Sequence, residues 1–381
     1  MKKLIIAVIM LVIVCTSALT VSATERNVSD TQNDIYNTSG ADKLYDSLDK
    51  ETRELLKEIG VEKPSGNVVE GVTFSKILSG ILKTASKLSG TAFTGMATIM
   101  GVMIIYSITE GFGGSLTHSS LREVSSVTAA LCMSAVIAIP ICEIISEANT
   151  VIIAASDFML AYIPVMLAVM ISCGNSLSGA GYYALMNSAS QVVAQLSSKL
   201  ITPMLNVFLA LSISNSVFSG INLNGLLRLF SKTVKWVLSF SFTLFSALLT
   251  FKSLITSSVD SVSSRAVRYT MSTFVPVVGA ALSEAYRTVR GSVIILKNGI
   301  GVFVIFAVAL IFLPIVVKLL LWILSVNLCK AFGEMLNEKT PCEMLSGIST
   351  VLSTLLAVIF CIMALFIIST ALIMTIGGNV S

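Results

Sequence analysis

The chain has 381 residues, of which 55% are hydrophobic and only 12% are charged, and its mean hydropathy is +0.89. Soluble globular proteins carry roughly twice that charged fraction, so the composition excludes an ordinary soluble protein and predicts a membrane protein with several spans. The formal net charge of +4 is small, and the charged residues are spread along the chain. This gives no reason to expect nucleic-acid binding.

The first 23 residues have the pattern of a secretory signal peptide. Two lysines precede an apolar run over residues 4–14, and Val21-Ser22-Ala23 has the small residues of a cleavage site. We therefore expect residues 1–23 to be a signal peptide that is cleaved after Ala23. An uncleaved membrane anchor is the alternative, and in both cases the segment that follows is exported.

Residues 24–73 form the expected exported region, which is polar and charged. Residues 24–40 are rich in Thr, Asn, Ser and Asp, a composition typical of disorder. Residues 41–59 predict a charged helix that ends at Gly60. Its charged side is either a solvated face or a docking face for a partner. Its thin apolar stripe consists of Leu44, Leu48, Leu55 and Ile59.

Residues 74–90 predict an amphipathic helix. At 100° per residue, its large apolar side chains gather on one side, and Lys76, Lys83 and Lys87 lie on the other. A basic polar face is typical of a helix that lies on an anionic membrane surface, so we expect these lysines to contact membrane lipid. Packing against the protein's own soluble part is the alternative.

Residues 91–381 are expected to form a polytopic membrane domain, which makes the fold class all-α. A span needs about 20 apolar residues. Prolines lie in several candidates, so we expect about seven kinked transmembrane helices. The candidate spans are residues 92–109, 127–146, 150–172, 200–219, 236–256, 299–317 and 347–376.

The basic residues give an incomplete topology. With an exported N-terminal region and seven spans, the basic residues between 265 and 290 lie inside, as the positive-inside rule prefers. Arg228 and Lys232 then lie outside, against the rule. A re-entrant or interior hairpin formed by the polar stretch 178–198 and the span 200–219 would explain this, but it moves residues 265–290 outside. Both topologies stay open.

The segment 264–290 is the most polar part of the C-terminal half and is our candidate interface or pore region. Arg265 and Arg268 fall on one side of an amphipathic helix, with apolar residues on the other. Pro276 breaks or kinks that helix.

A second helix follows this proline within the same segment. Gly279 and Ser283 are four residues apart, a spacing of small residues that lets another helix approach closely in a membrane. Glu284 lies three residues before Arg287, and we expect the two side chains to pair because an unpaired charge is costly there.

Asp157 is a further candidate, because it lies in the otherwise apolar stretch VIIAASDFMLAYIPV. A carboxylate inside a membrane marks a functional site by default, with transport or proton coupling as its role. A position near the interface, or a structural cap or ion pair, is the alternative.

No enzyme motif is present. The chain lacks the HExxH pattern for zinc and the glycine-rich patterns for nucleotides. None of its seven cysteines has CxxC spacing, and the chain has a single histidine. We therefore expect no catalytic activity, no cofactor and no metal.

Two blocks of sequence resemble one family. The run FVPVVGAALSEA over residues 274–285, with Leu296-Lys297-Asn298 after it, is similar to the stage III sporulation protein AE family of endospore-forming bacteria. The block AYIPVM over residues 161–166, continued by SCGN over residues 172–175, resembles the same family. The resemblance extends over most of residues 40–378.

The resemblance implies a membrane component of a multiprotein export or feeding channel between mother cell and forespore, needed for late forespore development. The family is made in the mother cell and lies in the outer forespore membrane, with the N-terminal region in the intermembrane space. The implied partners are the other stage III sporulation A proteins, including a separate ATPase subunit and ring-forming subunits, and indirectly stage II sporulation protein Q.

A self-sufficient secondary transporter or permease is the alternative function. Its site would be built from broken helices, Asp157 and the polar stretch 175–195.

Overall fold

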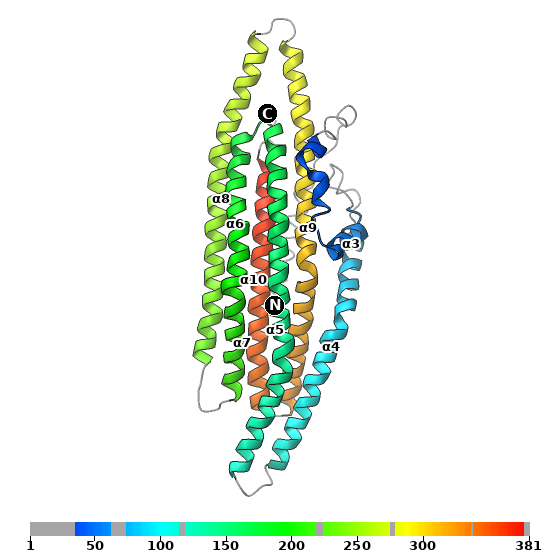
Figure 1. Ribbon diagram of the computed structural model, residues 1–381, viewed down its shortest axis with the longest axis vertical. Coiled ribbons are helices and arrows are strands. Elements are labelled where there is room, and N and C mark those ends of the chain that lie inside the picture. Colours follow the sequence, from blue (N-terminus) through cyan, green and yellow to red (C-terminus); the bar gives the residue numbers. More distant parts are fainter. Residues whose placement is uncertain are drawn as a thin grey trace.

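A computed structural model describes residues 35–61, 74–113, 119–217, 224–274, 279–336 and 338–376. Across these residues every regular element is a helix, which confirms the all-α class. The long helices run up and down in one elongated bundle (Figure 1).

The bundle is built from seven long helices, counted over the described residues. They are α4 (Phe74–Gly113), α5 (Ser119–Ser172), α6 (Ser176–Leu196), α7 (Thr202–Val217), α8 (Asn224–Phe274), α9 (Gly279–Met335) and α10 (Lys339–Thr375). The last of these, α10, lies at the centre and packs against α5, α7, α8 and α9 (Figure 1). Half or more of its side chains are buried, as expected for a helix that is apolar on all sides.

Six helical stretches in the described residues are long and apolar enough to cross a membrane. They are Ser75–Thr109, Ala130–Ser172, Ser176–Asn215, Gly225–Ser263, Arg287–Met335 and Lys339–Thr375. By length and composition the chain is a multi-pass membrane protein. The predicted count of about seven was one too high for the part of the chain that is described.

The difference lies in α5, where the predicted spans 127–146 and 150–172 are parts of one helix. Glu143 and Glu147 lie near the junction of these two predicted spans, and carboxylates are rare at membrane depth. In the structure both carboxylates lie on one continuous helix, where Glu147 pairs with Lys318 of α9 and Glu143 is exposed.

The polar stretch 178–198 does not fold back as a hairpin. It belongs to α6 and to η2 (Ser197–Ile201), a π-helix of five residues that leads directly into α7. A π-turn accommodates about one extra residue within a helix. Before it, α6 packs mainly on α5 and α8, and after it, α7 packs mainly on α10 and α5.

Ahead of α4, the chain folds onto the side of the bundle. The predicted helix over residues 41–59 is two elements, η1 (Ala41–Leu44) and α3 (Lys50–Ile59). The predicted stripe of four apolar residues is buried, and α3 packs against α4 and α9. Gly60, at φ 86°, ends α3 as predicted, and the N–H of Val61 donates to the Leu56 carbonyl at 2.9 Å.

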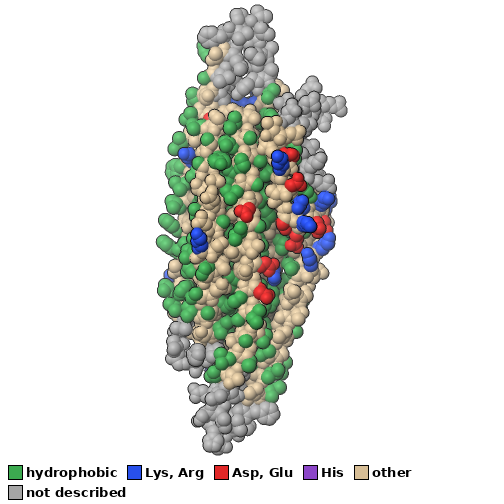
Figure 2. All heavy atoms as spheres, in the orientation of Figure 1, with side chains coloured by type: hydrophobic (Ala, Val, Ile, Leu, Met, Phe, Trp, Pro, Cys, Tyr) green, Lys and Arg blue, Asp and Glu red, His purple; other side chains and the backbone are tan. Residues whose placement is uncertain are grey.

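The predicted surface helix over residues 74–90 is not separate from the first span, because α4 runs unbroken from Phe74 to Gly113. Lys83 pairs with Glu58 of α3, and Lys87 pairs with Glu51 at 3.1 Å. Both lysines thus contact carboxylates of α3, as in the alternative, and their contact with membrane lipid stays a prediction. The charges form a dense patch on this flank, unlike the largely apolar surface around it (Figure 2).

Candidate functional site

The polar segment 264–290 lies at one end of the bundle, where α8 ends at Phe274 and α9 begins at Gly279. Arg265 of α8 and Arg287 of α9 are both exposed. The remaining predicted residues of this segment have no described surroundings. Pro276 lies outside the described residues, and nothing is described of the environment of Arg268, Gly279, Ser283 and Glu284. The pairing of Glu284 with Arg287 therefore stays a prediction.

Two of the remaining candidates are exposed. Asp157 lies on the outer side of α5, not in the interior, and it has no ion pair among the described residues. Lys76 is exposed near the start of α4. The carboxylate that the fold does bury belongs instead to Asp260, which is 4% exposed.

Asp260 joins α8 to the start of α6. Its carboxylate accepts the backbone N–H of Ser178 at 2.8 Å and that of Leu177 at 3.3 Å. The N–H groups in the first turn of a helix have no partner within the helix, and the helix dipole favours a negative charge at that end. Asp260 therefore caps α6 from a neighbouring helix 82 residues further along the chain.

Lys297 is the second charged side chain that is buried among the described residues, at 0% exposed. It lies on α9, and its ammonium donates to the carbonyl of Ile376, the residue that follows α10. Burial of an ammonium is costly unless it is well paired. The carbonyl end of α10 carries partial negative charge, which offsets part of that cost.

Several polar atoms close in sequence to Lys297, or to the first turn of α6 that Asp260 caps, are buried and have no hydrogen-bond partner among the described residues. They are Nδ2 of Asn175, Oγ of Ser178, Nε of Arg290 and Oδ1 of Asn298. Cys173 lies close enough to Lys297 and Arg290 to interact electrostatically with both. Residues of α6, α8, α9 and the ends of α5 and α10 thus bring polar groups to the same end of the bundle.

We define this set of Asn175, Ser178, Asp260, Arg290, Lys297 and Asn298 as the polar end cluster. Buried donors and acceptors with unused capacity normally bind water or a polar solute. The cluster can therefore hold water or a polar group inside an otherwise apolar bundle. Among the residues that the structure describes, no group of three or more His, Cys, Asp and Glu could hold a metal ion.

Sequence reasoning did not single out Lys297 or Asp260 as site residues. Lys297 lies at the end of a long uncharged run, where a lysine normally reaches the membrane surface. Asp260 lies in a serine-rich stretch, and no pattern in the sequence pointed to it. One available signal was the position of Lys297 within the Leu296-Lys297-Asn298 block that carries part of the family resemblance.

Comparison with known proteins gives one family. The model of the family described as "Stage III sporulation protein AE (spore_III_AE)" matches residues 61–377. The stage III sporulation protein AE of Bacillus subtilis (strain 168) is 23% identical over 158 residues, which is 42% of this chain. The matched part covers 40% of that relative's length. No solved structure gives a significant match.

Proposed function

The chain belongs to the stage III sporulation protein AE family, and from this premise we propose that it is a membrane component of a multiprotein export or feeding channel between mother cell and forespore. Family membership supports a role in sporulation. The observation that carries the proposal is the extent of the match, since residues 61–377 include all six stretches that are apolar enough to cross a membrane.

In this proposal the chain lies in the outer of the two membranes around the forespore and its N-terminal region faces the intermembrane space. It acts with the other stage III sporulation A proteins and, through them, with stage II sporulation protein Q. A separate ATPase subunit supplies the energy, and this chain has no catalytic role of its own. The absence of a nucleotide-binding motif from the sequence is consistent with that division of work.

The exposed apolar surface of α8 supports a role within an assembly. Large apolar side chains recur every three or four residues along its outer side, among them Trp236, Phe240, Leu244, Leu248 and Phe251. Such a face suits lipid or another membrane helix. In the proposed channel this face is where the bundle meets lipid or a neighbouring subunit.

A self-sufficient transporter is the second candidate, and the polar end cluster is the observation that favours it. A buried lysine beside unpartnered amide and hydroxyl groups is the kind of intramembrane site that binds a polar solute. Such a transporter would act alone on its substrate. The channel component would have no activity without its partners.

Affinity purification from sporulating cells separates the two candidates. Tagged full-length protein is solubilised in mild detergent after cross-linking, and co-purified proteins are identified by mass spectrometry. We expect recovery of the other stage III sporulation A proteins. Recovery of this chain alone would contradict the channel proposal.

A pair of variants tests whether the polar segment contributes to the assembly. Arg265→Gln and Arg228→Gln each remove one exposed arginine from α8, at opposite ends of the helix. We expect Arg265→Gln to lower the yield of co-purified partners, and Arg228→Gln to serve as the matched control that leaves it unchanged. Equal yields from both variants would rule out a contribution of Arg265.

A further inference from the structure

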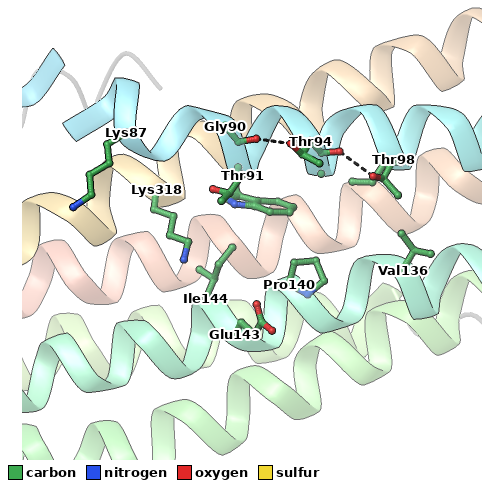
Figure 3. Close-up of a pocket in the computed structure, with 13 residues that line it drawn as sticks. Lys87, Gly90, Thr91, Thr94, Thr98, Val136, Pro140, Glu143, Ile144 and Lys318 are labelled. Carbon is green, nitrogen blue, oxygen red and sulfur yellow. Dashed lines mark hydrogen bonds between the residues drawn. The ribbon is translucent and has the colours of Figure 1, made fainter. Parts of the chain in front are cut away.

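A hollow of about 620 Å³ lies between α4, α5 and α9 (Figure 3). Its volume falls within the range of roughly 300–1,000 Å³ that small-molecule sites occupy. All three helices belong to the stretches that are apolar enough to cross a membrane. None of the residues that line the hollow belongs to the polar end cluster.

The α4 wall of the hollow presents oxygen acceptors. Thr91, Thr94 and Thr98 line it, and each donates its hydroxyl proton to a backbone carbonyl of its own helix, at 2.9, 2.7 and 2.9 Å respectively. A hydroxyl whose proton is used in this way still has a lone pair to offer. In the close-up the three threonines follow one another along the side of α4 that faces α5 (Figure 3).

The α9 wall contributes an unused donor. Trp322 lines the hollow and is only 4% exposed, and its indole Nε1 is buried with no partner among the described residues. Gly95 makes room for this ring, since a Cβ at Gly95 would lie 2.6 Å from Cη2 of Trp322. A buried indole N–H normally has an acceptor. The missing acceptor can come from a ligand.

The charges around the hollow leave one carboxylate without a cation. Lys87 is paired with Glu51, and Lys318 is paired with Glu147. Glu143 of α5 also lines the hollow and has no ion pair among the described residues. The carboxylate of Glu143 is drawn on the hollow side of α5, beside Pro140 and Ile144 (Figure 3). Glu143 is exposed, so a cation can reach its carboxylate from outside, and a carboxylate at membrane depth is unfavourable until a cation meets it.

We propose that this hollow binds a ligand that bears a primary ammonium group next to an oxygen atom. The ammonium pairs with the Glu143 carboxylate and donates to threonine oxygens of α4, while the Trp322 N–H donates to the ligand's oxygen. A metal ion fits less well, because calcium requires six or more oxygen ligands and magnesium an octahedral set, usually with more than one carboxylate. The ammonium group comes either from a free amino alcohol or from the ethanolamine head group of a phospholipid.

Trp322 provides the readout for the free amine. The chain has two tryptophans, so Trp236→Phe leaves Trp322 as the sole indole reporter. Full-length protein with this substitution is placed in phosphatidylglycerol nanodiscs and titrated with ethanolamine, while tryptophan fluorescence is recorded. Native mass spectrometry of protein from nanodiscs that contain equal phosphatidylglycerol and phosphatidylethanolamine then reports which lipid stays bound.

We expect at least one of the two readings to be positive. A saturable fluorescence change identifies the free amine as a ligand, and selective retention of phosphatidylethanolamine identifies the lipid head group. Glu143→Gln should weaken the positive reading about ten-fold or more, because it removes a charge-assisted hydrogen bond. Asp157→Asn is the matched control, since it removes another carboxylate of α5 that does not line the hollow.

Negative results in both readings would overturn the proposal, and so would equal binding by wild-type protein and Glu143→Gln. Thr94→Val provides a second variant if Glu143→Gln does not fold. It removes one acceptor from an exposed position with little change in shape, and it should weaken binding about three-fold or more. Binding to Thr94→Val at the wild-type level would likewise contradict the site.

Discussion

Two exposed lysines on the flank of the bundle and one buried lysine at its end show two different environments of the same side chain. Lys83 and Lys87 have 72% of their side chains exposed and pair with carboxylates of α3. Lys297 is 0% exposed and binds a backbone carbonyl at the end of α10. Exposed ion pairs contribute little to stability because water screens them, whereas a buried charge is costly unless its surroundings satisfy it. Substitution of the exposed lysines should therefore change the stability of the fold little, whereas substitution of Lys297 should change it strongly.

Reversal of the buried charge should give the largest effect. In Lys297→Glu a carboxylate would face the Ile376 carbonyl and the negative end of α10, so we expect a loss of about 3–5 kcal/mol in the free energy of unfolding. Thermal unfolding and size-exclusion profiles of the detergent-solubilised protein measure this loss. Lys199→Glu, at an exposed position, is the control. Equal behaviour of the two variants would contradict the buried position of Lys297.

The buried cap on α6 should give an intermediate effect. Asp260→Ala leaves the N–H groups of Leu177 and Ser178 without their acceptor, so we expect a loss of about 1–3 kcal/mol. Asp260→Asn should lose less, because its amide oxygen can still accept one of the two. Faster hydrogen exchange at Leu177 and Ser178 would locate the effect, and Asp157→Ala should leave both exchange rates unchanged.

The exposed pairs should give the smallest effect. Lys83→Gln and Lys87→Gln should leave the thermal unfolding midpoint of the whole protein unchanged, since both side chains remain largely in water. A double-mutant cycle with Glu58→Gln measures the coupling of Lys83 to its partner directly. A coupling as large as the loss in Lys297→Glu would show that the comparison between exposed and buried lysines does not hold.

The sequence predicted the long apolar helices well, because an uncharged apolar run of about 20 residues is typical of a membrane-spanning helix. The run 299–317 lies within α9, and all but the last residue of the run 347–376 lies within α10. The buried stripe and the terminal glycine of α3 were also correctly predicted. These features depend on residues close to each other in the chain, which is the range that periodicity detects.

The prediction was wrong where distant residues decide the structure. Glu147 lies within α5 and pairs with Lys318, 171 residues further along. Asp260 is buried and accepts two backbone N–H groups of α6. Neither partner is visible from local composition, so two spans were predicted within α5 and Asp260 was not singled out. The same limit kept the polar end cluster out of the predicted site.

The π-helix η2 has a consequence for how this chain can change by mutation over generations. Because a π-turn already accommodates one extra residue, loss of a single codon within residues 197–201 would restore ordinary α-helical pairing and leave nearly the same side of α7 toward the core. Leu205, Phe208 and Leu209 would stay buried. Descendants can therefore lose one residue here more easily than within α6 or α7, where the same loss would rotate the rest of the helix by about 100°.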